Sequence, residues 1–152
     1  MPESSSTQLD DFNRQVLLCQ DDAFTLACDL LGDEQEAAEV ARQAFEHVFR
    51  HNSRGISIRL AAMRRIIEDC MHIAPSSRKV KDLLVTLLPE PELLTLYLVD
   101  HLLLSHAETA IVLRCSQDRI ERRLALARWK IANYDRIELR HAHVQDAHIG
   151  RR

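Results

Sequence analysis

Hydrophobic residues recur at intervals of three and four positions along most of the chain, which is the spacing of amphipathic α-helices. After residues 1–7, a polar lead expected to be disordered, the first such segment ends at Leu31, directly before the helix-terminating Gly32. A second segment covers residues 33–50 and a third covers about 57–72. The inward-facing positions predicted for the first two segments are Phe12, Val16, Phe24, Ala27, Leu30, Leu31, Ala37, Ala41, Phe45, Val48 and Phe49. The pattern therefore predicts three helices in the first half of the chain.

The second half has the pattern of a support helix followed by a helix-turn-helix. Ser105 and Glu108 have the spacing of a capping box, in which each side chain accepts a backbone N–H of the other residue. Ala110 stands where the two helices of the motif must approach closely. Ser116 is a second candidate N-cap, and the residues that follow it at helical spacing are Ile120, Leu124, Ala127 and Ile131. This last helix is expected to continue to Arg140.

The apolar stripe of the last helix leaves a cluster of arginines facing outward. One helix fits the DNA major groove, where arginine can bond guanine edges or phosphates. The candidate DNA-binding residues are Ser105, Gln117, Arg119, Arg122, Arg123 and Arg128. The alternative is a solvated face on which Asp118 pairs with Arg122, and Glu121 with the neighbouring arginines. The third helix carries a second candidate set for phosphate contact, or for a plain solubilising face: Arg59, Arg64 and Arg65.

Composition supports an all-α fold. Hydrophobic residues make up 46% of the 152 residues and aromatic residues only 5%, and the chain has three Gly and four Pro. A leucine- and alanine-rich chain of this kind favours packed helices over sheets. The Pro-Ser-Ser break at residues 75–77 is the expected boundary between two units. The predicted organisation is a helical domain at 8–73, a linker at 74–82, a helix-turn-helix domain at 83–140 and a disordered tail at 141–152.

The formal net charge of −3 conceals an asymmetry between the two halves. Residues 1–50 carry a charge of −8, whereas residues 51–152 carry +5. A basic second half is compatible with nucleic-acid binding, which the overall charge alone would argue against. The segregation predicts two surfaces with different partners.

Several classes of site are missing from the sequence. The four cysteines form no C-x-x-C pair and the eight histidines lack structural-zinc spacing, so we expect reduced thiols and no metal or cofactor. The sequence contains no nucleophile-elbow, phosphate-loop or zinc-peptidase motif, and we expect neither enzymatic activity nor a small-molecule substrate. The polar start and the lack of a bilayer-length apolar run predict a cytoplasmic protein without a membrane partner.

Two stretches carry residues in the order and spacing of a known family. In the C-terminal half these residues are Leu88, Pro89, the apolar run to Leu104, Ser105, Glu108, Ala110, Leu113, Ser116, Ile120, Arg123, Leu124, Ala127 and Arg128. Within residues 23–51 they are Leu31, Gly32, Asp33, Ala37, Glu39, Phe45 and Phe49. Both halves thereby resemble bacterial RNA polymerase sigma factors of the extracytoplasmic-function type. The chain resembles a diverged member, because Arg42 stands where the family usually has Gln, and Ile58 and Arg65 also depart from its pattern.

The resemblance implies a region-two-like helical domain joined to a region-four-like helix-turn-helix domain. Such a protein recruits core RNA polymerase to promoter DNA in transcription initiation, and the resemblance also allows an anti-sigma factor as a partner. The implied polymerase-binding residues are Glu36, Glu39, Arg42, Gln43 and Glu46, for which a solvated helix face is the plainer interpretation. Two other functions stay open. They are a stand-alone helix-turn-helix transcriptional regulator and a degenerate sigma-like module that acts only by protein–protein interaction.

Overall fold

The computed structural model describes residues 3–51, 55–73, 90–134 and 136. Every regular element in these ranges is a helix, which confirms the all-α prediction. The elements are α1 (Glu3–Leu31), α2 (Glu34–His51), α3 (Ile58–Met71), α5 (Glu90–Leu96), the π-helical turn η2 (Tyr97–His101), α6 (His106–Val112) and α7 (Gln117–Ala132). Among the described residues, no helix combines the length and the apolar composition of a membrane span.

The first three helices end and begin close to where local sequence signals predict. Gly32 ends α1 with a φ of 70°, a left-handed conformation that glycine adopts without a Cβ clash. The carboxylate of Asp33 accepts two backbone N–H groups of the first turn of α2, both at 3.0 Å. Ser57 caps α3 in the same way. The exception is the start of α1 at Glu3, so the prediction of a disordered lead is wrong for residues 3–7.

Small residues allow α1, α2 and α3 to pack closely. The most deeply buried side chains of this bundle include Leu26, Ala27, Leu31, Ala37, Ala44, Ala62, Met63 and Ile66. Most positions predicted to face inward are buried or half-buried, but Phe24 and Phe49 are 38% and 44% exposed. Alanines at several contact positions bring the helices close together, which limits the room for large rings between them. Phe49 therefore packs at the edge of the bundle, where its ring centroid lies 4.9 Å from that of Phe12.

The helices α5, η2, α6 and α7 form the helix-turn-helix and its support. Their buried cluster consists of Leu96, Ala110, Ile120, Leu124 and Ala127. Ion pairs hold α7 against the support: Lys130 lies 2.9 Å from Glu92 and Arg128 lies 2.6 Å from Asp100. The apolar stripe predicted for the last helix is confirmed except at Ile131, which is 38% exposed.

The last helix is shorter than predicted. α7 ends at Ala132, and Asn133 caps it by donating from its side-chain amide to the carbonyl of Trp129 at 2.8 Å. Asparagine favours helix ends because its short side chain competes for local backbone groups. The continuous helix predicted to reach Arg140 is therefore interrupted at Asn133, and residues 137–140 lie outside the described ranges.

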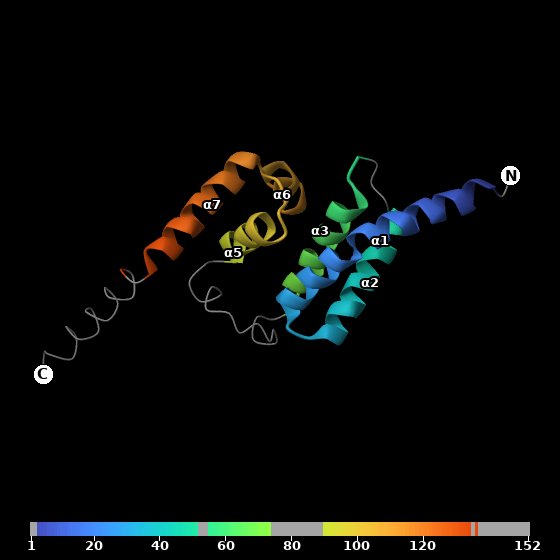
Figure 1. Ribbon diagram of the computed structural model, residues 1–152, viewed down its shortest axis with the longest axis horizontal. Coiled ribbons are helices and arrows are strands. Elements are labelled where there is room, and N and C mark those ends of the chain that lie inside the picture. Colours follow the sequence, from blue (N-terminus) through green and yellow to red (C-terminus); the bar gives the residue numbers. More distant parts are fainter. Residues whose placement is uncertain (1–2, 52–54, 74–89, 135, 137–152) are drawn as a thin grey trace, which may run out of the picture.

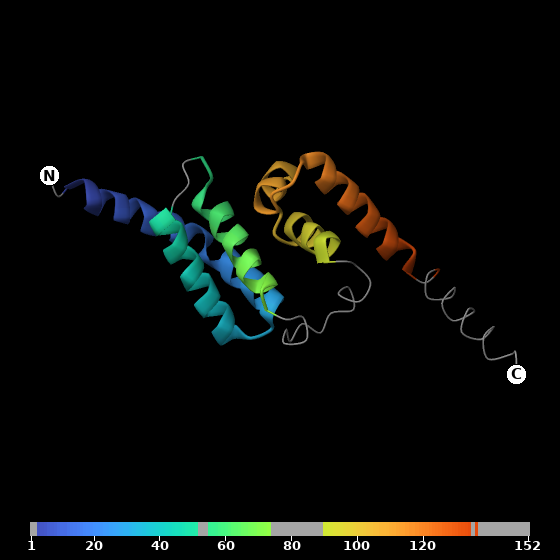
Figure 2. The ribbon, with the colours of Figure 1, turned by 180° about the vertical axis from the view of Figure 1, so that it is seen from behind.

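The two halves share one hydrophobic core. The residues that the second half adds to the buried cluster of α1–α3 are Leu94, Leu98, Leu102, Leu104 and Val112. Two opposite views show α6 beside α3 (Figures 1 and 2), and these helices are in contact. The Tyr97 hydroxyl of η2 also donates to Asp29 of α1, and burial together with this carboxylate raises the pKa of Tyr97. The predicted linker at 74–82 and tail at 141–152 lie outside the described ranges.

Candidate nucleic-acid interface

The helix-turn-helix begins with the predicted capping box. The hydroxyl of Ser105 accepts the backbone N–H of Glu108 at 3.1 Å, and the Glu108 carboxylate accepts the N–H of Ser105 at 2.8 Å. This backbone hydrogen bond lowers the pKa of Glu108. The Ser105 hydroxyl oxygen accepts in this cap, so Ser105 positions the start of α6, and the cap does not use the O–H donor of the hydroxyl.

The turn between α6 and α7 is a Schellman motif. Arg114 adopts a φ of 51°, while the N–H groups of Cys115 and Arg114 donate to the carbonyls of Ala110 and Ile111 at 3.0 Å and 3.4 Å. Glycine usually occupies the left-handed position, and a residue with a Cβ costs about 1–2 kcal/mol there. Ser116 then caps α7 by accepting the N–H of Arg119 at 3.3 Å. Both predicted N-caps of the motif are thus confirmed.

The arginines predicted to bind DNA do not share one environment. Arg119 and Arg122 are exposed on α7, and neither side chain has an ion pair or hydrogen bond with another described residue. Arg123 is half-buried, with its Nη1 3.9 Å from the Cys115 sulfur, and Arg128 is held by Asp100. Gln117, the first residue of α7, is exposed.

The alternative interpretation pairs Asp118 and Glu121 with the arginines of α7. Among the described residues, neither of these ion pairs is formed. Glu121 instead faces His106 of α6, with Nδ1 and Oε1 3.7 Å apart. Asp118 is exposed beside the arginines and has no ion pair in the described part of the chain. The outer face of α7 therefore offers two arginine side chains to a partner.

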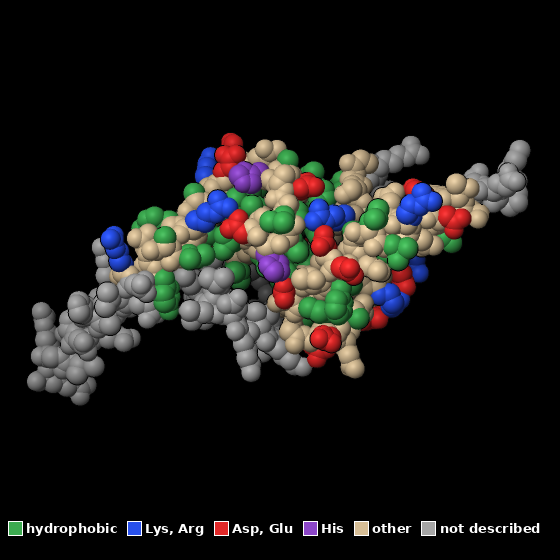
Figure 3. Space-filling view, in the orientation of Figure 1, with side chains coloured by type: hydrophobic (Ala, Val, Ile, Leu, Met, Phe, Trp, Pro, Cys, Tyr) green, Lys and Arg blue, Asp and Glu red, His purple; other side chains and the backbone are tan. Residues whose placement is uncertain are grey.

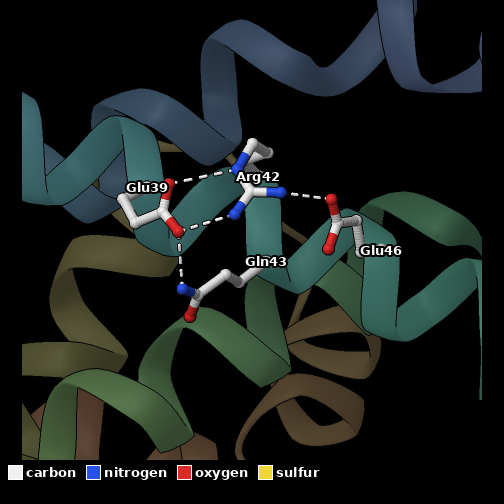
Figure 4. Close-up of polar contacts among 4 residues, drawn as sticks. All are labelled: Glu39, Arg42, Gln43 and Glu46. Atoms are coloured by element: carbon white, nitrogen blue, oxygen red, sulfur yellow. Dashed lines mark hydrogen bonds and ion pairs between the residues drawn. The ribbon is translucent and has the colours of Figure 1, made fainter.

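The residues predicted to bind polymerase form a network on the exposed side of α2 (Figure 4). Arg42 bonds Glu39 at 2.6 Å and also bonds Glu46, while the Gln43 amide donates to Glu39 at 2.7 Å. The bonds from Arg42 and Gln43 lower the pKa of Glu39 from 4.5 to about 2. Glu36 is exposed one turn earlier on the same helix. The structure thus brings four of the five residues together in a single interacting group.

The three arginines of α3 are all engaged inside the molecule. Arg59 bonds Asp22 at 2.9 Å and lies 3.4 Å from the Leu102 carbonyl. Arg64 donates to the Ile111 carbonyl at 3.1 Å. Arg65 pairs with Asp69 at 3.0 Å, one turn along its own helix. Two of the three therefore tie α3 to the second half of the chain.

The charge asymmetry between the halves is partly used inside the molecule. Asp22, within the acidic residues 1–50, lies 2.9 Å from Arg59, within the basic residues 51–152. Glu68 of α3 lies 2.9 Å from Arg114 in the turn, a pair within residues 51–152. On the face shown in Figure 3, acidic and basic side chains lie interspersed over both halves. Part of the charge of each sign is therefore paired inside the molecule.

Sequence reasoning missed two features of this region. The first is a pair of large apolar side chains on the outer side of α7, Leu126 and Trp129, which are 44% and 58% exposed. Their four- and seven-residue offsets from Arg122 place them along the same side of the helix and provided a usable signal. The second is the contact of Arg114 with α3, for which the sequence holds no local signal.

Comparison of the chain with protein-family models, with curated proteins and with solved structures found no match. The described residues contain no group of three or more His, Cys, Asp or Glu side chains arranged to hold a metal ion. The functional argument therefore depends on the geometry of the arginine-bearing helix and its support.

Proposed function

We propose that this chain is a sigma-like DNA-binding transcription factor that recruits RNA polymerase to promoter DNA. The observation that carries the proposal is the outer face of α7, where Arg119 and Arg122 are exposed and have no partner among the described residues. Arginines that are not used by the fold retain all their N–H donors for phosphates and guanine edges.

The capped turn supports this role because it fixes how α7 is presented. Arg119 and Arg122 lie in the first two turns of α7, about 4.5 Å apart along the axis at the usual helical rise. The positive end of the helix dipole, near Ser116, adds an attraction for phosphate. Arg128 is paired with Asp100 and is assigned to phosphate contact, and Arg123, which lies against Cys115, is assigned to positioning of the helix.

The N-terminal half supplies the proposed polymerase contact. The Glu39–Arg42–Glu46 network fixes charged groups of both signs on the exposed side of α2. A preorganised polar surface loses less side-chain entropy on binding than a free one. The protein would act by recruitment and positioning, without catalysis, and an anti-sigma factor would compete for the same surfaces.

A second candidate is a stand-alone helix-turn-helix regulator. The shared core favours it, because Leu98 and Val112 of the second half are buried with residues of α1–α3. A one-piece molecule suits a single DNA site better than two separated promoter elements. Core RNA polymerase discriminates the two candidates, since a stand-alone regulator binds DNA without co-purifying with polymerase. The third candidate, a module that acts only on other proteins, predicts no DNA binding at all.

The proposal is tested with the full chain, core polymerase and a pool of genomic promoter fragments. Mobility shift is measured at about 50 mM and 200 mM salt, because each phosphate contact steepens the salt dependence by about one unit. We expect retardation that weakens with salt, co-purification with core polymerase, and transcription from selected promoters. No retardation at low salt excludes both DNA-binding functions. Retardation without polymerase binding selects the stand-alone regulator.

A further inference from the structure

A cleft of about 90 Å³ lies where α2, α3 and the turn of the helix-turn-helix meet. Its polar lining consists of His47, His51, Arg64, Arg65, Glu68 and Arg114. The apolar floor comes from short or branched side chains of α2 and α3, among them Val48 and Ala61. The cleft is distinct from the outer face of α7 and from the network on α2.

The three arginines of the cleft retain donors that the fold does not use. Arg64 donates Nε and Nη2 to the Ile111 carbonyl, Arg65 donates Nε and Nη2 to Asp69, and Arg114 donates Nε to Glu68. A guanidinium group has five N–H donors, so each group keeps at least one nitrogen that these bonds leave unused. The unused donors come from two segments that are far apart in the sequence.

The lining has an excess of positive charge. Three guanidinium groups and the Glu68 carboxylate line the cleft, and Asp69 pairs with Arg65 beside it, so one positive charge is in excess when both histidines are neutral. Burial, and after it the repulsion from the Arg114 charge, lower the pKa of Arg64, against an opposing effect of Glu68. An anion between them would relieve that repulsion.

The two histidines line the cleft beside the arginines. Their rings stack with centroids 4.4 Å apart, and Nδ1 of His51 lies 3.1 Å from the His47 carbonyl. Burial, Arg65 and His51 lower the pKa of His47, against an opposing effect of Asp69 and Glu68 on α3. A bound anion would favour the protonated ring and raise that pKa.

We propose that this cleft binds a phosphate group, held by the free donors of Arg64, Arg65 and Arg114 and flanked by the His47–His51 pair. Arginine forks match the oxygens of phosphate geometrically, which selects this class of anion. Because its lining comes from α2, α3 and the turn, the bound phosphate ties the helix-turn-helix to the N-terminal bundle. The group is either a free phosphate or a backbone phosphate of nucleic acid.

The test follows the imidazole resonances of His47 and His51 by NMR in the full chain. Inorganic phosphate is titrated at constant ionic strength against sodium chloride, and a short DNA duplex is titrated separately. We expect saturable shifts of both rings and a His47 titration midpoint that moves to higher pH. The Arg65→Gln variant should weaken phosphate binding by about fivefold, because one charge-assisted donor is lost.

Two further variants make this result specific. Arg65→Gln combined with Asp69→Asn removes the helix-internal pair without changing the net charge, and it should still bind phosphate more weakly than the unaltered chain because the Arg65 donors are lost. Arg14→Gln, an exposed change on α1, should bind phosphate like the unaltered chain. Circular dichroism confirms that each variant is folded.

The outcomes separate the sources of the phosphate. Shifts with inorganic phosphate that weaken in Arg65→Gln identify a site for free phosphate. Shifts that require the duplex, persist in Arg122→Gln and weaken in Arg65→Gln identify a backbone phosphate. No saturable shift with either probe, or equal shifts in Arg65→Gln, overturns the site. The promoter-binding proposal is judged independently by mobility shift.

Discussion

The arginines of α3 and those of α7 belong to the same residue type but have different surroundings. Arg59 and Arg64 on α3 bond a carboxylate or backbone carbonyls of distant segments. Arg119 and Arg122 on α7 are exposed and have no such partner among the described residues. Donors already used within the fold stabilise it, whereas unused donors are available to a ligand. The comparison teaches that the number of arginines on a helix does not show which donors the fold uses, because that depends on the partners that tertiary packing brings to each side chain.

The largest effect is expected from Leu98→Ala, which disrupts the core on which both sets of arginines depend. Leu98 is fully buried in the cluster shared by the two halves. Losing its side chain should lower the free energy of unfolding by about 2–5 kcal/mol, because a cavity remains in the core. Urea denaturation followed by circular dichroism measures this change. Leu18→Ala, at a position that is 83% exposed, is the control and should cost less than about 0.5 kcal/mol. A similar small loss in Leu98→Ala would refute the shared core.

A smaller loss of stability is expected for Arg59→Gln on α3. The substitution removes the ion pair with Asp22 and the bond to the Leu102 carbonyl. Both ionic side chains are partly exposed, so solvent screening reduces the cost to about 1 kcal/mol. Thermal and urea unfolding measure it, with Arg14→Gln as the exposed control. An unchanged unfolding free energy would show that the bonds of Arg59 do not stabilise the fold, as expected for the exposed Arg119 and Arg122 of α7.

The network on α2 sharpens the comparison, because Arg42 is exposed and yet bonded to acids of its own helix. The bonds from Arg42 and Gln43 lower the pKa of Glu39 from 4.5 to about 2. A folded-state pKa below the unfolded value means that the stabilising contribution is present above about pH 4.5. It is lost as the pH falls toward 2. NMR titration of the Glu39 carboxyl should give the low midpoint, and Arg42→Gln should return it toward 4.5. A midpoint near 4.5 in the unaltered chain contradicts the network.

The smallest net effect is expected for Arg114→Gly in the turn. Glycine relieves the left-handed strain but loses the ion pair with Glu68, which lies 2.9 Å away. These terms are similar in size, so the unfolding free energy should change by less than about 1 kcal/mol. Arg114→Ala keeps the strain and loses the pair, and it should be about 1 kcal/mol less stable than the glycine variant. Equal stability of the two variants would show that the left-handed backbone is unstrained.

Local features of the fold could be predicted from the sequence, because the groups that create them are neighbours in the chain. The capping box of Ser105 and Glu108, the cap at Ser116 and the inner stripe of α7 all follow from spacings of three or four residues. The misplaced Phe24 and Phe49 show the limit of periodicity. It identifies the apolar side of a helix, but it does not show that alanines allow the helices too close for an aromatic ring.

The partners of the arginines could not be predicted in this way. Arg59 bonds a residue 37 positions away, Arg64 one 47 positions away, and Arg114 one 46 positions away. Tertiary packing creates these contacts, and no local pattern encodes them. The sequence therefore could not show that the fold engages the arginines of α3 and leaves Arg119 and Arg122 of α7 exposed.

The central claim is tested most directly by comparing the DNA affinity of Arg122→Gln with that of Arg59→Gln at one salt concentration. Fluorescence anisotropy with promoter fragments selected by the unaltered chain gives both dissociation constants. Arg122→Gln should weaken binding by about 5- to 150-fold, corresponding to about 1–3 kcal/mol, with unchanged unfolding. Arg59→Gln should bind DNA like the unaltered chain despite its lower stability. Equal affinities of all three proteins, or a larger loss in Arg59→Gln, would contradict the assignment of α7 as the DNA-binding helix.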